Sequence, residues 1–213
     1  MKIKILNLYC GIGGNRKLWD NNKVEITAIE NNEEIAKIYQ DFFPNDKVIV
    51  ADAHQYLLEH YKEFDFIWSS PPCPTHSRVR FMAAISEDER NKHPSFNPKF
   101  PDLKLYEEII FLQHHFKGKY VIENVISYYN PLIKPFIYQS HYYWSNFLIF
   151  GKKIGFRCHN GSVKEKQELK GFDLSKYKLE SVRKDQILRN CVEPKAGLEI
   201  FNMAFKTKQT TLK

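Results

Sequence analysis

The sequence contains no apolar run of membrane-spanning length, no internal repeat and no low-complexity tract. Charged residues interrupt every hydrophobic stretch, which argues against a transmembrane helix and a membrane partner. The amino terminus runs directly into a strand pattern and lacks a signal-peptide cleavage site. We therefore expect a cytoplasmic protein of bacterial or phage origin.

Cysteine is scarce, and the four cysteines are widely spaced without a CxxC pair. This spacing argues against a disulfide framework and favours reduced thiols. Cys158 and His159 have no second pair of ligands at a suitable spacing, so we expect no metal site.

Excess positive charge is confined to the last third of the chain. Residues 1–146 carry 17 Lys and Arg against 18 Asp and Glu, whereas residues 147–213 carry 15 against 7. Such asymmetry indicates a surface that faces a polyanion, most simply nucleic acid. A solvated lysine-rich surface explains the charge equally well.

Strand and helix patterns alternate along the chain of 213 residues. Strand patterns cover residues 2–9, 24–30, 47–51, 64–68, 119–123 and 142–150. Helical patterns cover residues 15–19, 32–42, 54–61, 103–112 and 191–205, with Asn32 and Asp102 as expected caps. The alternation predicts an α/β fold with a doubly wound, mostly parallel sheet, and the basic residues 152–188 form a small irregular lobe.

The chain is organised around Ser69–Ser77, which follows one of these strands. Two prolines hold the backbone extended and present Cys73 at the carboxyl end of the strand. Chemistry collects at such ends in an open α/β sheet, so Cys73 is a candidate nucleophile. A buried packing role is the commoner one for an average cysteine.

A glycine-rich turn and three acids occupy the other strand ends. The turn at Asn7–Gly14 lets a ligand approach the backbone closely, although such turns serve several cofactors or none. Glu30 and Asp52 end the second and third strands, and together they favour a nucleoside ligand. Glu123 follows the fifth strand, where it is either a helix cap or a proton-handling group beside the thiol.

The order of these motifs resembles the cytosine-5 DNA methyltransferase family over residues 3–206. The glycine turn, Glu30, Asp52, the Pro-Pro-Cys sequence and Glu123-Asn124-Val125 follow the order of the family. Residues 189–194 also resemble the GNxVxP motif that precedes the family's final helix. Five motifs in order make a specific resemblance.

The resemblance implies a methyltransferase that uses S-adenosylmethionine to methylate C5 of a cytosine flipped out of duplex DNA. Cys73 would attack C6 of the base and Glu123 would hydrogen-bond N3. The residues implied to bind the cofactor are Tyr9, Gly11, Gly13, Gly14, Glu30, Asp52, Pro72 and Asn190. Among the residues expected to contact the substrate, Ser77 would order the loop of the nucleophile, and Arg78 and Arg80 belong to the loop expected to close over the base. The basic charge of the small lobe predicts phosphate contacts from Lys152, Lys153 and Arg157.

The sequence departs from the family pattern at several positions. Asn7 replaces an aspartate, and Pro74 replaces the amide residue that follows the nucleophile. The arginine pair that contacts the base is missing, and His141 stands at the position of its second member as a candidate catalytic residue. A strand-edge polar role for His141 is equally compatible with the sequence.

The resemblance also divides the chain. Residues 1–151, completed by the closing segment 189–213, would form the catalytic and cofactor-binding domain, and residues 152–188 would form a target-recognition lobe. A lobe this small leaves few side chains for base readout. We therefore expect a short or relaxed sequence preference, or help from a partner protein or a second copy. Residues 78–101 are expected to form a loop that closes over the flipped base.

Three alternatives stay open. The same chemistry could act on RNA or on a free nucleotide. Ser70-Pro71-Pro72-Cys73 also resembles the tetrapeptide of the amino-methyltransferases, although Glu123-Asn124-Val125 argues against that group. Finally, the chain could be a catalytically weak, nucleic-acid-binding subunit of a methylating complex.

Overall fold

The computed structural model describes residues 1–78, 100–151 and 161–206. Within them one sheet of seven strands has the order β3-β2-β1-β4-β5-β7-β6. The strands are β1 (Ile3–Leu8), β2 (Val24–Glu30), β3 (Lys47–Val50), β4 (Phe66–Ser69), β5 (Lys119–Val125), β6 (Phe136–Tyr138) and β7 (His141–Ser145). The pairs of β7 with β5 and with β6 are antiparallel and the other four pairs are parallel, so the doubly wound, mostly parallel sheet is confirmed.

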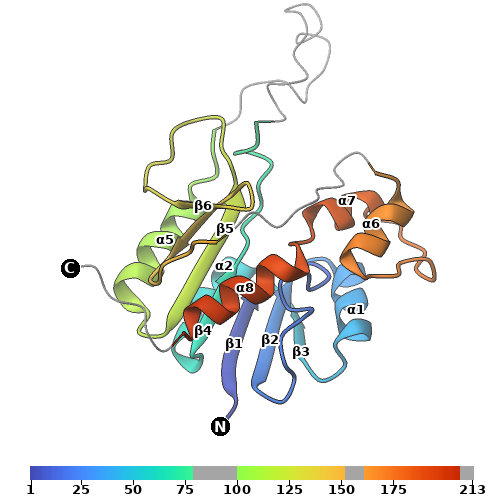
Figure 1. The fold of residues 1–213 in the computed structure, drawn as a ribbon, viewed down its shortest axis with the longest axis horizontal. Helices are drawn as coiled ribbons and strands as arrows, with labels where there is room; N and C mark the ends of the chain where they lie inside the picture. Colours follow the sequence, from blue (N-terminus) through green and yellow to red (C-terminus); the bar gives the residue numbers. More distant parts are fainter. Residues whose placement is uncertain (79–99, 152–160, 207–213) are drawn as a thin grey trace, which may run out of the picture.

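Helices cover both faces of this sheet (Figure 1). They are α1 (Glu33–Phe42), α2 (Ala53–His60), α5 (Lys104–His115), α6 (Val163–Lys170), α7 (Lys184–Asn190) and α8 (Pro194–Ala204), with a short 3₁₀ turn at Tyr61–Glu63. Buried residues of α2 and α5 pack with one face of β1 and β4, and those of α1 and α8 pack with the other.

The alternation of side chains along each strand produces these two cores. On β1, Leu6 and Leu8 pack toward Leu105 and Ile109 of α5, while Ile5 belongs to the opposite cluster. All of these side chains are almost completely buried. Burying both faces of a parallel sheet explains the nearly continuous apolar strands in the sequence.

Helix α8 packs against the loop that follows β1. Trp19 stacks on Phe201 of α8 with ring centroids 4.8 Å apart, and its Nε1 donates to the Gly197 carbonyl at 3.3 Å. A Cβ on Gly197 would lie 2.4 Å from the Asn15 carbonyl oxygen. Only glycine therefore permits this approach of α8 to the loop.

Several predicted elements differ from the structure. The helix expected at residues 15–19 is a series of turns, because Arg16 points into the protein and binds Asp46. The strand expected at 142–150 ends at Ser145, and the short partner strand β6 was not expected. The closing helix begins at Pro194 rather than at residue 191.

The two expected helix caps have different outcomes. Asn32 caps α1 as predicted, because its side chain accepts the Ile35 amide. Leu103 rather than Asp102 is the N-cap of α5, and the Asp102 side chain accepts the Lys104 amide at 3.1 Å instead. The Asp102 cap was therefore wrong by one position.

The basic segment after residue 160 is more regular than expected. It contains α6, whose capping box joins Ser162 and Glu165, and α7. Phe172 between these helices packs edge-on against Phe42 of α1, with centroids 4.9 Å apart. This segment thus shares a core with the sheet domain, and the proposed division into domain and lobe stays a prediction.

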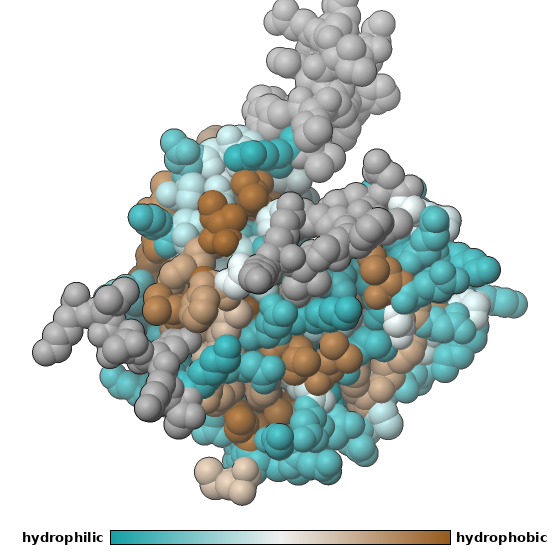
Figure 2. All heavy atoms as spheres, in the orientation of Figure 1, coloured by the Kyte–Doolittle hydropathy of each residue, from teal (hydrophilic) through white to brown (hydrophobic). Residues whose placement is uncertain are grey.

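The surface in the view of Figure 2 is mixed, with hydrophilic side chains over much of the α6 side and apolar ones near β6. Ile137 of β6 is 67% exposed on this edge strand. Among the described helices, none has the length and apolar content needed to cross a bilayer.

Candidate active site

The predicted nucleophile lies at the carboxyl end of β4. The turn that carries it is closed by two amides, because the backbone N–H groups of His76 and Ser77 donate to the Cys73 carbonyl at 3.0 and 3.1 Å. The side chain of Cys73 is half-buried. The thiol therefore has a fixed position near the surface, as a nucleophile requires.

The segment that follows β5 holds this turn from the other side. Asn124 Nδ2 donates to the Pro71 carbonyl at 3.0 Å, and Ser77 forms an isolated bridge with Ser127. Arg78 Nε also donates to the Ser127 carbonyl at 2.9 Å. The residues predicted from the two motifs are thus joined by direct contacts.

Glu123 lies close enough to Cys73 to affect its ionisation. Burial raises the pKa of the Cys73 thiol, and the negative charge of Glu123 raises that pKa further. Cys73 follows β4 and Glu123 lies near the end of β5, the adjacent parallel strand, in which Ile122 is in register with Ser69 of β4. The thiol is consequently protonated at neutral pH until the charge near it changes.

His141 contacts the same carboxylate. Its Nε2 lies 3.5 Å from Oε1 of Glu123, and the two side chains are 32% and 13% exposed. In the antiparallel pairing of β5 and β7, Glu123 is opposite Tyr143 while His141 is opposite Val125. The contact is therefore a diagonal cross-strand pair, which brings Cys73, Glu123 and His141 into one neighbourhood.

The glycine turn follows β1 and is bound by the acid that ends β2. The Gly11 amide donates to Oε2 of Glu30 at 3.0 Å, and the Asn32 amide donates to Oε1 at 3.1 Å. Burial raises the pKa of Glu30, and these amides oppose that shift. Glu30 therefore fixes the turn while remaining at the strand end where it was predicted.

The three glycines of the turn have different environments. A Cβ on Gly11 would meet no heavy atom within 4 Å, although its φ of +54° favours glycine. A Cβ on Gly13 would lie 2.4 Å from the Phe43 ring, and one on Gly14 would lie 2.2 Å from the Val192 carbonyl oxygen. Gly11 leaves room for a ligand, whereas the other two allow close packing of the protein itself.

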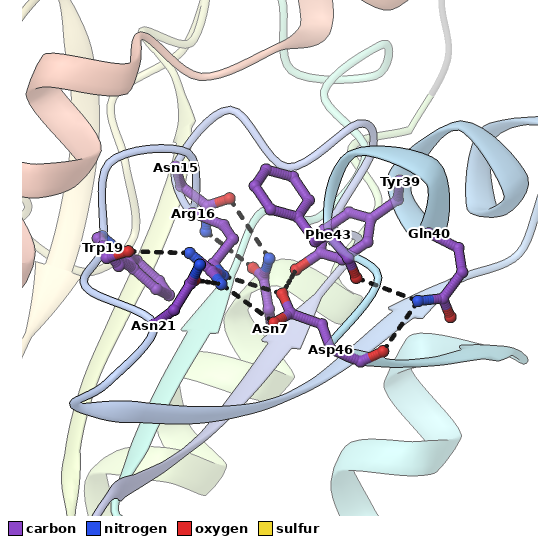
Figure 3. A network of polar contacts seen from close by, with 9 residues as sticks. All are labelled: Asn7, Asn15, Arg16, Trp19, Asn21, Tyr39, Gln40, Phe43 and Asp46. Atoms are coloured by element: carbon purple, nitrogen blue, oxygen red, sulfur yellow. Dashed lines mark hydrogen bonds and ion pairs between the residues drawn. The ribbon is translucent and has the colours of Figure 1, made fainter.

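A buried polar network supports the turn from below (Figure 3). Asn15 Nδ2 donates to Oδ1 of Asn7 at 2.8 Å, which pairs two buried amide side chains. Arg16 Nε donates to Oδ2 of Asp46 at 2.9 Å, and the Tyr39 hydroxyl donates to the same oxygen at 2.9 Å. The departure at Asn7 thus has a structural reason, since an amide both donates to and accepts from Asn15.

A small pocket of about 110 Å³ opens beside these loops. Its walls are Tyr9, Asn31, Asp52, Pro71, Pro72, His76, Asp102, Lys104 and Leu105. Three of the residues predicted to bind the cofactor, Tyr9, Asp52 and Pro72, therefore meet at one pocket. An aromatic ring, a carboxylate and a proline of the nucleophile turn are suited to an adenosine group, so the residues present fit the predicted cofactor.

The family comparison decides the classification. The model of the family described as "C-5 cytosine-specific DNA methylase" matches residues 3–127, which is more than half of the chain. The chain belongs to this C-5 cytosine methylase family. Members use S-adenosylmethionine as methyl donor, and the predicted family and cofactor are thereby confirmed.

Curated relatives of this chain carry a more specific name. The chain is 23% identical over 117 residues to the human "tRNA (cytosine(38)-C(5))-methyltransferase", and 24% identical to the Rattus norvegicus protein of the same name. These matches cover 53% of this chain but only 30% of each relative. The match thus spans less than a third of the length of those relatives.

Solved structures similar to this chain include a Spodoptera frugiperda DNMT2 mutant and the S. pombe Dnmt2 methyltransferase. Their identities are 23% and 18%, and their TM-scores are both 0.37. Each match covers 58% of this chain, against 36% and 34% of the other chain.

Of the remaining predicted site residues, some lie at the pocket, one lies away from it and others fall outside the described residues. Asp52 caps α2 by accepting the Gln55 amide at 2.9 Å, in addition to lining the pocket. Asn190 ends α7 as an exposed residue and is not among the residues of the pocket wall. The predictions for Arg80, Lys152, Lys153 and Arg157 lie outside the described residues. Most of the loop at 78–101 lies outside them too.

Sequence reasoning missed a buried acid next to the residues of the pocket wall. Glu108 of α5 is fully buried and accepts hydrogen bonds from Tyr9 and Ser69, and it also contacts His54. Its sequence signal is a charged residue among the apolar positions Leu105, Ile109 and Leu112 on the buried side of the helix. A charge on such a face is expected only where it has partners.

Proposed function

We propose that this protein is an S-adenosylmethionine-dependent cytosine-5 methyltransferase that acts on DNA through a covalent bond between Cys73 and the base. The main support is the proximity of Cys73 and Glu123 at the ends of two adjacent parallel strands. The pocket lined by Tyr9, Asp52 and Pro72 lies on the same edge of the sheet. A thiol, an acid and a nucleoside pocket are the groups that this reaction needs.

The chemistry begins with the weak nucleophilicity of C5 in cytosine. When the Cys73 sulfur bonds to C6, the electron pair of the C5–C6 double bond moves to C5. S-adenosylmethionine, when bound, supplies the methyl group at C5. Loss of the C5 proton then restores the double bond and expels the Cys73 thiolate.

Glu123 links the arrival of the base to the activation of the thiol. At rest, its negative charge helps keep Cys73 protonated. We propose that the proton of Cys73 passes to Glu123 and from there to N3 of the bound cytosine. This transfer removes the charge that opposed the thiolate and stabilises the ring during addition. His141, 3.5 Å from the same carboxylate, orients it for the transfer.

Two kinds of nucleic acid are candidate substrates. The excess positive charge after residue 146 supports a nucleic acid, and the base must leave its stack to reach Cys73, at a cost of roughly a few kcal/mol. Duplex DNA agrees with the description of the matched family. A second candidate is tRNA, because the curated relatives are named as tRNA methyltransferases.

The decisive experiment uses nucleic acids that contain 5-fluorocytosine. Fluorine cannot leave C5 as a proton does, so the covalent adduct with Cys73 accumulates in the presence of S-adenosylmethionine. Duplex DNA, single-stranded DNA and tRNA are compared on denaturing gels, with Cys73→Ser as the inactive variant and Cys158→Ser as the matched control. We expect an adduct on DNA that Cys73→Ser abolishes and Cys158→Ser preserves.

Each outcome separates the candidates. An adduct on tRNA alone would identify tRNA, rather than DNA, as the substrate. A methylated product that is N-methylcytosine or N-methyladenine, rather than 5-methylcytosine, identifies an amino-methyltransferase. No adduct on any of these nucleic acids, with nucleic-acid binding retained, overturns the catalytic proposal in favour of a binding subunit.

A further inference from the structure

One buried carboxylate, that of Glu108, contacts three separate segments beside the pocket. The Tyr9 hydroxyl donates to Oε1 of Glu108 at 2.7 Å, and the Ser69 hydroxyl donates to Oε2 at 2.6 Å. Nδ1 of His54 lies 3.2 Å from Oε1. Tyr9 follows β1, Ser69 ends β4, and His54 lies in the first turn of α2 after β3.

These contacts explain how Glu108 tolerates complete burial. An isolated carboxylate in a protein interior is strongly disfavoured, and it persists when hydrogen-bond donors surround it. Burial raises the pKa of Tyr9 and the charge of Glu108 adds to that effect, so the phenol keeps its proton and donates. The hydrogen bond from His54 to Glu108 likewise raises the pKa of the imidazole.

The three donors lie next to the pocket wall. Tyr9 is itself part of that wall, and its φ of 52° is unusual for a residue with a side chain. Such a conformation is strained and persists only where surrounding contacts fix it. His54 is two residues from Asp52, and Ser69 is three residues from Pro72, which are both wall residues.

We propose that Glu108 is a positioning residue of the cofactor site. It fixes the ring of Tyr9 through the hydroxyl and ties that ring to the loops carrying Asp52 and Pro72. It acts through these groups and does not itself line the pocket. The inference rests on the proposed function in one respect, namely that this pocket binds the adenosine part of S-adenosylmethionine.

The test measures the dissociation constant of S-adenosylhomocysteine by titration calorimetry. Glu108→Gln removes the charge and one acceptor, while Tyr9→Phe keeps the ring and removes only the hydroxyl. We expect each change to weaken binding about tenfold, the typical effect of one hydrogen bond to a charged group. Adding Tyr9→Phe to Glu108→Gln should weaken binding by less than Tyr9→Phe does in the wild-type protein, because the remaining amide oxygen accepts a weaker hydrogen bond from Tyr9 than the carboxylate does.

Glu107→Gln is the matched control. Glu107 is the adjacent acid on α5, its side chain is 63% exposed, and its Oε2 lies 3.4 Å from Nε2 of the same His54. Its replacement should leave the dissociation constant within about twofold of the wild-type value. Thermal unfolding and near-ultraviolet circular dichroism report whether each variant keeps its fold.

Kinetics on the nucleic acid that forms the adduct provide a second readout. Glu108→Gln should raise the KM for S-adenosylmethionine about tenfold and leave kcat at saturation nearly unchanged. A general loss of structure would lower both the active fraction and kcat instead.

The inference is overturned if Tyr9→Phe binds S-adenosylhomocysteine as tightly as the wild type, or if its effect and that of Glu108→Gln multiply. Tyr9→Phe keeps the test valid even where Glu108→Gln unfolds. Absence of binding to the wild-type protein would overturn the cofactor assignment, and this inference with it. Wild-type binding with unchanged variants overturns this inference alone.

Discussion

Asn124 Nδ2 donates a hydrogen bond of 3.0 Å to the carbonyl oxygen of Pro71, two residues before the nucleophile. The contact joins the end of β5 to the turn after β4 and is almost completely buried. Because Pro71 has no amide hydrogen, its carbonyl is the one backbone group through which this residue can be held. The position of Cys73 relative to Glu123 therefore depends on Asn124.

Replacing Asn124 tests this dependence. Asn124→Ala should slow adduct formation at least about tenfold, because small errors in the placement of a reacting group are costly. Its free energy of unfolding should fall by about 1–3 kcal/mol, since the Pro71 carbonyl loses its donor. Quenched time courses of adduct formation and urea denaturation measure the two effects. Asn130→Ala, at an exposed position six residues later, should change neither.

The ionisation of Cys73 gives a prediction on pH. Burial first, and then the charge of Glu123, raise the pKa of the thiol, so its alkylation by iodoacetamide should have a midpoint above the usual value of about 8.5. Glu123→Gln removes the negative charge, which favours the thiolate and lowers the midpoint. Peptide mass spectrometry follows the modification of Cys73 separately from the other cysteines. An unchanged midpoint in Glu123→Gln would contradict the charge contact.

The pair of Arg16 and Asp46 gives a prediction on stability. Their side chains are 3% and 5% exposed, so removing one partner leaves a buried charge without compensation. Arg16→Met should lower the free energy of unfolding by about 3–5 kcal/mol, as in other buried pairs. The double variant Arg16→Met with Asp46→Asn should lose less than the sum of the single losses, measured by guanidinium denaturation. If the losses of the two single variants simply add in the double variant, Arg16 and Asp46 do not stabilise each other.

Two glycines of the same turn form a matched pair of substitutions. Gly13→Ala combines a φ of +82° with a Cβ 2.4 Å from the Phe43 ring, so we expect a loss of about 2–4 kcal/mol in stability. Gly11→Ala has only the strain of its φ of +54°, or about 1 kcal/mol, but its Cβ enters the open space. Gly11→Ala should therefore weaken S-adenosylhomocysteine binding more than it lowers the melting temperature. If Gly11→Ala lowers the melting temperature more than it weakens binding, the ligand does not occupy the space beside Gly11.

The sequence predicted those parts of the fold that depend on local patterns. The strands that became β1, β2 and β4 are apolar runs that end in turn residues, and Asn32 is followed by two acids at the start of α1. The turns at residues 15–19 were missed because they depend on Asp46, which is distant in sequence from Arg16. The short strand β6 lies between Pro135 and a pair of residues with positive φ, too brief to produce a pattern.

The candidate site shows the same distinction. Cys73, Glu123 and Asp52 lie at or just beyond the carboxyl ends of strands, so their shared edge could be predicted from the order of elements. Glu108 lies inside a helix, and only the packing of α5 on the sheet brings it to Tyr9 and Ser69. Helix α6 was missed although Ser162 and Glu165 form a capping box that can be read in the sequence.

The approach of α8 to the first loop also constrains how the chain folds during synthesis. Gly14 packs under Val192, and Trp19 donates to the Gly197 carbonyl, so the cofactor turn acquires its final packing from residues made almost 180 positions later. During synthesis, the loop after β1 can pack in this way only after α8 has emerged from the ribosomal exit tunnel, and until then its apolar side chains are exposed. Chains interrupted before α8 should therefore lack this packing of the first loop.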